Sequence, residues 1–179
     1  KNQQVGNFFL KNLSKIWANP EYQKVKDELL ELMLKFEICF QIPDTEQFIV
    51  PQLLAPSEPI FEFPEGPVIN LHFQYNFMPR GLLTRFIVHM NHYIQDHSLV
   101  WKEGIILNRL NTFARVIEDY DGHAIKIQIG GERRKEMMAI VTDEFEHLHK
   151  VYPQKLEVQK LIPCNCQGCS KAEQQPYFY

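Results

Sequence analysis

The sequence predicts an α+β fold: an antiparallel or mixed sheet with two long helices on one face, preceded by a partial winged-helix-like helical block. Three observations predict it. Strands that alternate apolar and polar residues are interleaved with two amphipathic helices in the later part of the chain. A proline-rich segment separates them from an earlier helix and hairpin. The apolar fraction of 45% and charged fraction of 23% are those of an ordinary globular protein.

Residues 1–57 form the first predicted domain. The stretch QKVKDELLELMLKF places Val25, Leu29, Met33 and Phe36 at helical spacing, and NFFLKNLSKIW before it predicts a further helical turn or two. EICFQI and QFIVPQLL flank Pro43-Asp44 and predict a β-hairpin. Helix, helix and hairpin is the order of a winged helix, which raises the alternative of a zinc-containing winged-helix module that binds nucleic acid.

Charge weighs against that alternative. Residues 1–57 carry six Lys/Arg and seven Asp/Glu, and the whole chain has a net charge of −3. Affinity for DNA comes mainly from basic groups that displace counterions. We therefore expect a packing module and no nucleic-acid partner.

Residues 58–179 form the second predicted domain, after the linker-like segment LLAPSEPIFEFPEGP. In PVINLHFQYNF, apolar Leu71, Phe73, Tyr75 and Phe77 alternate with polar residues, which predicts a half-buried strand. Its aromatic face needs a cover. Phe73 and Tyr75 are therefore candidates for a dimer or partner surface.

Two helices and a meander follow. PRGLLTRFIVHMNHYIQ and ERRKEMMAIVTDEFEHLHKVY each carry a broad apolar stripe and predict the two helices. Between them, GIILNRL, TFARVIEDY and HAIKIQIGG predict successive strands, with a short Asn-containing turn between the first two and Asp121-Gly122 as a two-residue hairpin turn. LEVQKLI predicts a last strand.

The search for catalytic groups finds only generic pairs. Glu144 and His147 share one helix face, as do His89 and His92, and solvated helix faces explain both pairs. There is no G-x-x-x-x-G-K-[ST] phosphate loop and no G-x-S-x-G elbow. We predict that the chain is not an enzyme and holds no cofactor of its own.

The tail LIPCNCQGC is the most specific local motif. Cys164, Cys166 and Cys169 offer three soft ligands, whereas a closed zinc site takes four, so Cys39, His147 or His149 would have to complete it. Turn-forming residues surround these cysteines, which favours a structural role, with zinc as the alternative. The sparse, clustered cysteines and the start at Lys1 predict a cytoplasmic piece of a longer protein. No run reaches the roughly 18 apolar residues of a membrane span.

YNFMPRGLLTRFIVHM, VWKEGIIL and LIPCNCQGC followed by PYFY resemble the COR domain of Roco proteins, GTPases in which a Ras-like Roc domain is followed by COR. The resemblance covers nearly the whole chain: the end of the first COR subdomain, then the second. Some family members also carry leucine-rich repeats and take part in signalling.

The resemblance implies a non-catalytic dimerisation and relay domain that couples Roc to dimer state and to downstream domains. It implies a homodimer, with GTP or GDP and magnesium bound by the parent's Roc domain. Phe77 matches the strand-end aromatic that faces the GTPase, where tyrosine is frequent. Arg85 matches the family's arginine on the following helix, with a partner carboxylate or solvent as its open alternatives.

Overall fold

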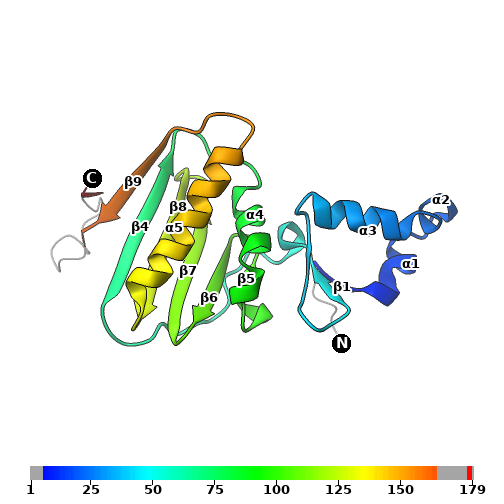
Figure 1. Cartoon of the computed structure of the whole chain (residues 1–179), viewed down its shortest axis with the longest axis horizontal. Helices are drawn as coiled ribbons and strands as arrows, with labels where there is room; N and C mark the ends of the chain where they lie inside the picture. Colours follow the sequence, from blue (N-terminus) through cyan, green and yellow to red (C-terminus); the bar gives the residue numbers. More distant parts are fainter. Residues whose placement is uncertain (1–5, 165–176, 179) are drawn as a thin grey trace.

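A computed structural model describes residues 6–164 and 177–178 of the chain. It has a small N-terminal lobe joined to a larger lobe built on one antiparallel sheet (Figure 1). The α+β prediction is confirmed. Within the described residues, no helix is both long and apolar enough to cross a membrane.

The N-terminal lobe, hereafter the N lobe, combines a three-stranded antiparallel sheet of order β1-β3-β2 with short helices. Its strands are β1 (Asn7–Phe9), β2 (Phe40–Gln41) and β3 (Gln47–Ile49). Its helical elements are η1 (Leu10–Asn12), α1 (Leu13–Ile16), α2 (Pro20–Gln23), α3 (Lys26–Lys35) and η2 (Pro51–Leu53). The predicted hairpin is confirmed as β2 and β3, while strand β1 takes the place of the first part of the predicted helical segment.

The apolar stripe predicted on α3 is only partly buried. Leu30 is buried and Leu29 and Met33 are half-buried, but Val25 lies in solvent and Phe36 is 63% exposed. The lobe is thin, so one face of α3 packs on the small sheet and the rest of the stripe has no described neighbour to cover it. Helical spacing identified the helix but overestimated the width of its buried face.

The larger lobe, hereafter the sheet lobe, contains seven antiparallel strands in the order β10-β9-β4-β8-β7-β6-β5. They are β4 (Val68–Tyr75), β5 (Val100–Trp101), β6 (Gly104–Arg109), β7 (Thr112–Asp119), β8 (Ala124–Gly131), β9 (Val158–Pro163) and β10 (Tyr177–Phe178). The predicted meander is β6, β7 and β8. The strand of alternating aromatics, β4, is central, paired with β8 on one side and β9 on the other.

Helices α4 (Leu82–His89) and α5 (Arg134–Val151) cover one face of this sheet (Figure 1). Phe86 of α4 stacks on Phe145 of α5 with centroids 4.2 Å apart, and Phe145 also lies 5.4 Å from Phe73 of β4. The three rings join both helices to the sheet in one core.

The first of the two helices is shorter than predicted. It ends at His89, and the chain continues through the 3-10 turns η3 (Asn91–Tyr93) and η4 (His97–Leu99). The side-chain amide of Asn91 donates to the carbonyl of Val88 at 2.6 Å, a local bond that competes with helix continuation. Met90 and Ile94 are still buried, so the apolar stripe was predicted correctly even though the helix was not.

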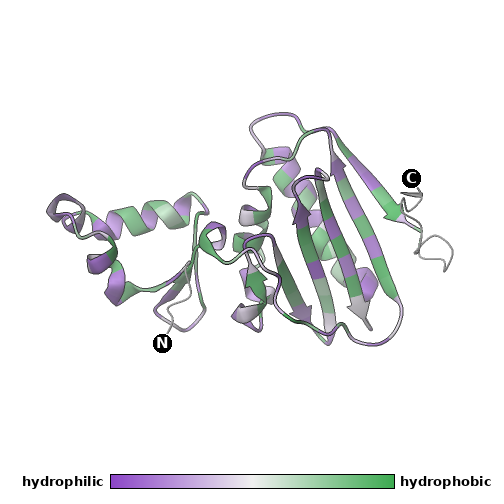
Figure 2. Ribbon diagram, turned by 180° about the vertical axis from the view of Figure 1, so that it is seen from behind, coloured by the Kyte–Doolittle hydropathy of each residue, from purple (hydrophilic) through white to green (hydrophobic). Residues whose placement is uncertain are grey.

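The segment between the lobes crosses the other face of the sheet, which Figure 2 shows free of helices. The Glu58 carboxylate binds the Arg115 guanidinium through two contacts of 2.5 and 2.7 Å. Phe61 packs on Phe113. A Cβ on Gly130 would lie 2.8 Å from the ring of Phe63, so only glycine admits this crossing. The predicted linker is thus a strap over the sheet.

The short Asn-containing turn predicted between the first two strands of the meander is confirmed, whereas the two-residue turn predicted at Asp121-Gly122 is wrong. Leu110 and Asn111, between β6 and β7, both have positive φ, as a two-residue type I′ turn requires. The loop that contains Asp121-Gly122 has four residues, and His123 takes the left-handed conformation there. Asn111 marked this turn in the sequence, but the left-handed conformation of Leu110 had no signal, because leucine is an unusual residue there.

Candidate functional site

The connection from β4 to α4 carries the candidate contact residue Phe77. The strand ends at Tyr75, and the neighbouring Met78 is buried. The side chain of Phe77 is 44% exposed, although the strand that it follows carries buried aromatics. The side-chain amide of Asn76 donates to the Glu157 carboxylate, which anchors the connection. The alternation of buried and partly buried side chains along β4 therefore ends at Tyr75, before Phe77.

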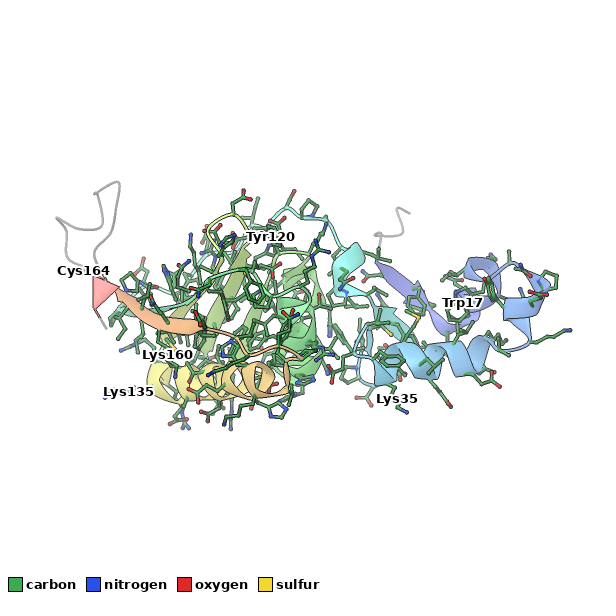
Figure 3. All side chains as sticks on the ribbon, turned by 90° about the horizontal axis from the view of Figure 1, so that it is seen from above. Trp17, Lys35, Tyr120, Lys135, Lys160 and Cys164 are labelled. Atoms are coloured by element: carbon green, nitrogen blue, oxygen red, sulfur yellow. The ribbon has the colours of Figure 1, made fainter. Side chains whose placement is uncertain are left out.

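A hollow of about 630 Å³ lies at the same end of the sheet. It is lined by the start of α4, the β5–β6 turn and the end of β7, with Arg80, Thr84, Lys102, Glu103, Glu118 and Tyr120 among its side chains. The Gln74 side chain donates to the carbonyl of Gly122 at 2.8 Å, and the Tyr75 N–H donates to that of His123 at 2.9 Å. These bonds hold the 120–123 loop, and exposed Tyr120 with it, beside the end of β4 (Figure 3).

Glu118 is the electrostatically unusual group of this hollow. Burial, and then the negative charge of Glu103, raise the pKa of the Glu118 carboxyl from 4.5 to about 7. Lys102 and Arg80 also line the hollow. The hollow therefore presents both signs of charge, with one carboxyl that changes protonation near neutral pH.

Phe73 and Tyr75 do not form a surface, which corrects the prediction that they are dimer or partner residues. Their side chains are 0% and 3% exposed. The ring of Phe73 packs on Phe145, and the Tyr75 hydroxyl lies 2.8 Å from Nε2 of His149. The prediction was right that these aromatics need a cover, but wrong about its source, because α5 of the same chain supplies it.

The Tyr75–His149 pair is a satisfied core contact. Burial lowers the pKa of His149 to about 4, so its imidazole is neutral. Its Nε2 shares a hydrogen bond with the Tyr75 hydroxyl, and no proton is transferred. Burial, and then Glu118, raise the pKa of the Tyr75 hydroxyl far above its ordinary value. Both groups therefore stay neutral across the physiological range.

The candidate zinc ligands are dispersed in the part of the chain that the structure describes. Cys164 directly follows β9, at the end of the molecule farthest from the N lobe (Figure 3). Cys166 and Cys169 lie outside the described residues. Cys39 is buried in the N lobe, where burial raises the pKa of its thiol to about 11 and so opposes the thiolate that a metal needs. Residues 6–164 contain no group of three or more His, Cys, Asp or Glu that could hold a metal ion.

The roles of the helix-face residues Glu144 and Arg85 were undecided from the sequence, and both residues contact side chains of other elements. Glu144 does not act with His147; its carboxylate contacts Nδ1 of His89 on α4 at 2.6 Å. Arg85 contacts Glu37, two residues beyond the end of α3, at 3.4 Å. The partner carboxylate considered for Arg85 therefore lies within this chain. Glu37 could not be predicted as this partner, because it lies far from Arg85 in the sequence and the two side chains meet only in the folded chain.

Phe77, exposed on an anchored connection, thus lies at the same end of the sheet as a hollow of mixed charge. The fold defines the class of protein as an α+β domain of two lobes, the larger built on a seven-stranded antiparallel sheet with two helices on one face.

Comparison with known families identifies the family to which the chain belongs. The family model described as C-terminal of Roc, COR-B domain, matches residues 66–179, and the one described as C-terminal of Roc, COR-A domain, matches residues 1–54. The chain belongs to this family and is the COR domain of a Roco protein, as its motifs predicted.

The chain is also similar to the probable serine/threonine-protein kinase qkgA of Dictyostelium discoideum, with 29% identity over 118 residues. The similarity covers 55% of this chain and 8% of that protein, so the chain spans a small part of the length of the curated relative it matches.

Proposed function

We propose that this chain is a non-catalytic dimerisation and relay domain, which couples the neighbouring Roc GTPase domain to the dimer state and to downstream domains of its Roco protein. Membership of the COR family supports the assignment. The observation that carries it is the exposure of Phe77, an anchored aromatic at the end of an otherwise buried strand. In this proposal, Phe77 packs on Roc.

The position of Phe77 suits a relay. Its connection leads directly into α4, through Gly81 in the left-handed conformation. Helix α4 packs on η2, and its Arg85 and His89 contact Glu37 beyond the end of α3. A partner that binds Phe77 therefore acts on a helix that contacts both lobes, because packed cores transmit displacement rather than absorb it.

The Phe77→Ala variant tests the contact, with Leu110→Ala as its control. Both residues are exposed, but Leu110 lies at the opposite end of the sheet, in the β6–β7 turn. We expect Phe77→Ala to weaken association with an added Roc domain by about 2 kcal/mol, roughly thirtyfold, because a central aromatic anchor commonly contributes that much. Titration calorimetry measures the affinity, and thermal melting checks that each variant is folded.

The two variants separate a contact from a general loss of stability. We expect Leu110→Ala to bind Roc as the unsubstituted chain does, and both variants to keep its melting temperature within about 2 °C. Equal affinities for Phe77→Ala and the unsubstituted chain would contradict the proposed contact. Light scattering over a range of concentrations tests dimerisation, and a mass that stays monomeric at the highest concentration contradicts that part of the proposal.

A further inference from the structure

A cluster of four charged or titratable side chains joins the two lobes. Glu37 follows α3 in the N lobe, whereas Arg85 and His89 belong to α4 and Glu144 to α5. The Glu37 carboxylate contacts Nε2 of His89 at 2.9 Å and Nε of Arg85 at 3.4 Å. Nδ1 of His89 contacts the Glu144 carboxylate at 2.6 Å. His89 is therefore held between a carboxylate of one lobe and a carboxylate of the other.

This geometry specifies the charge of the imidazole. A carboxylate only accepts hydrogen bonds, and a neutral imidazole has one N–H donor and one lone pair. With a carboxylate oxygen at each nitrogen, neutral His89 would direct its lone pair at one of the two anions. Only the imidazolium, with two N–H donors, satisfies Glu37 and Glu144 together.

The backbone at Glu37 gives a second, independent reason to assign a role to this contact. The N–H of Ile38 donates to the carbonyl of Met33, and the N–H of Glu37 donates to that of Leu34, which is the Schellman arrangement at the end of a helix. Glu37 occupies the left-handed position of that motif, with φ of 57°. Glycine is the usual residue there, because a Cβ is disfavoured in this conformation. The local structure does not favour glutamate, whereas the contact to the other lobe requires it.

Other contacts between the lobes are mainly apolar or involve the backbone. Phe40, Ile49 and Leu54 of the N lobe pack into the core of the sheet lobe, and the Lys102 N–H donates to the carbonyl of Ala55. The ring of His97 also lies 6.3 Å from that of Phe40, without an ion pair to the N lobe among the described contacts. In the His89 cluster, by contrast, a single proton decides whether an imidazole pairs with carboxylates of both lobes.

We propose that His89 is a proton-operated latch between the lobes: as the imidazolium it bridges Glu37 and Glu144 and fixes one arrangement, and when neutral it keeps Nδ1–H on the closer Glu144, releases Glu37 and lets the lobes reorient. Arg85 remains a partner of Glu37 in both states, so the contact loosens without being abolished. This inference concerns contacts within the chain, goes beyond the proposed function and does not depend on it.

The groups that face His89 give the direction of the pH dependence. Glu37 comes from the end of α3, Arg85 from α4 itself, and Glu144 and His147 from α5, with the two histidine rings 6.3 Å apart. Burial alone would lower the pKa of His89, but its hydrogen bonds to the two carboxylates and their charges raise it overall. The latch is thus fully closed below the ordinary histidine pKa of about 6.5 and opens as pH rises through the raised value.

Residual dipolar couplings of backbone amides test the proposal on the intact chain. At about pH 6, where the imidazolium dominates, we expect the couplings of both lobes to fit one alignment tensor of equal magnitude. At about pH 9 we expect separate fits of different magnitude, because neutral His89 leaves the lobes free to reorient. Imidazole shifts recorded in parallel should place the midpoint for His89 above that of an unperturbed histidine.

Three variants assign the effect to the cluster. His89→Gln should show the high-pH behaviour at every pH, and Glu37→Gly should do the same while keeping the helix-ending turn that glycine favours. Glu144→Gln should show the low-pH behaviour at every pH, because its amide can donate to Nδ1 and leave Nε2–H of neutral His89 on Glu37. His92→Gln is the matched control, because the ring of His92 lies 4.1 Å from that of Tyr93, tilted by 45°, and takes no part in the contacts of the cluster. It should retain the native pH profile.

The proposal is overturned if both lobes fit one tensor at both pH values, or if the pH dependence survives in His89→Gln. It is equally overturned if His89 of the unsubstituted chain is already neutral at about pH 6, a measurement that needs no variant to fold.

Discussion

The two lobes differ in how completely each buries its own apolar residues. The sheet lobe has a continuous core that runs from β4 across β8, β7 and β6 beneath both helices. The separate core of the N lobe is small and consists of Phe8, Leu13, Leu30, Cys39, Phe48 and Val50. Several large apolar side chains of the N lobe lie in solvent, namely Ile16, Tyr22, Val25, Leu32, Leu34 and Phe36. The sheet lobe is stable through its own packing, whereas the N lobe depends more on its neighbours.

The largest effect on the free energy of unfolding should come from the removal of one buried aromatic ring in each lobe. Phe145→Ala removes a fully buried ring that contacts Phe86 and Phe73, and we expect it to cost about 4 kcal/mol. Phe48→Ala removes the ring stacked on Phe8 at 5.2 Å, and we expect about 2–3 kcal/mol, because the small lobe can collapse around the gap.

Denaturant unfolding followed by hydrogen exchange checks this prediction. Phe145→Ala should lower protection of amides throughout the chain, and Phe48→Ala mainly those of the N lobe. If Phe48→Ala lowers protection of the sheet strands as much as Phe145→Ala does, the two lobes unfold as one unit and the comparison between them fails.

An effect of intermediate size should be a pH dependence of the free energy of unfolding, because the sheet lobe partly buries the carboxyl of Glu118. The raised pKa of Glu118 means that the folded chain binds a proton more tightly than the unfolded chain between pH 4.5 and about 7. Stability should therefore fall as pH rises through that window. Glu118→Gln removes this loss, and we expect it to be more stable than the unsubstituted chain by about 1–2 kcal/mol at about pH 8.

Urea denaturation of both proteins at about pH 5 and about pH 8 measures the effect. The two stabilities should converge at the lower pH. A constant difference between them at both pH values would mean that the substitution acts through packing rather than through the charge of Glu118.

The smallest effect should come from the exposed stripe of α3. Phe36→Ser changes a ring that is 63% exposed, so we expect a change of less than about 0.5 kcal/mol in the free energy of unfolding. A loss above about 2 kcal/mol in thermal or chemical denaturation would show that the N lobe buries this face in solution. Glu31→Ser, an exposed polar position on the same helix, is the control.

Period-two alternation predicted the sheet well, because Ile125, Ile127 and Ile129 occupy the buried face that their spacing indicates. The same alternation on β4 identified Phe73 and Tyr75 as apolar-facing but could not reveal that α5 would cover them. Local periodicity specifies which side of a strand is apolar, and only the tertiary fold decides what lies against it.

The candidate site was predicted in part for the same reason. Phe77 was identified through a family motif, and its exposure then followed from where β4 ends. Glu37 and Glu118 gave no signal in the sequence. The contacts of Glu37 span two lobes, and the pKa of Glu118 depends on how deeply the folded chain buries it.

The central position of β4 also affects how the chain emerges during synthesis. Residues 68–75 pair with β8 at 124–131 and with β9 at 158–163, so one edge of this strand remains open while about fifty further residues are made, and the other while more than about eighty are made. Pairing over such sequence separations is slow, and open edges invite pairing between chains. The polar residues Asn70, His72 and Gln74 alternate with the apolar residues of β4. During synthesis they therefore reduce the tendency of the unpaired strand to aggregate.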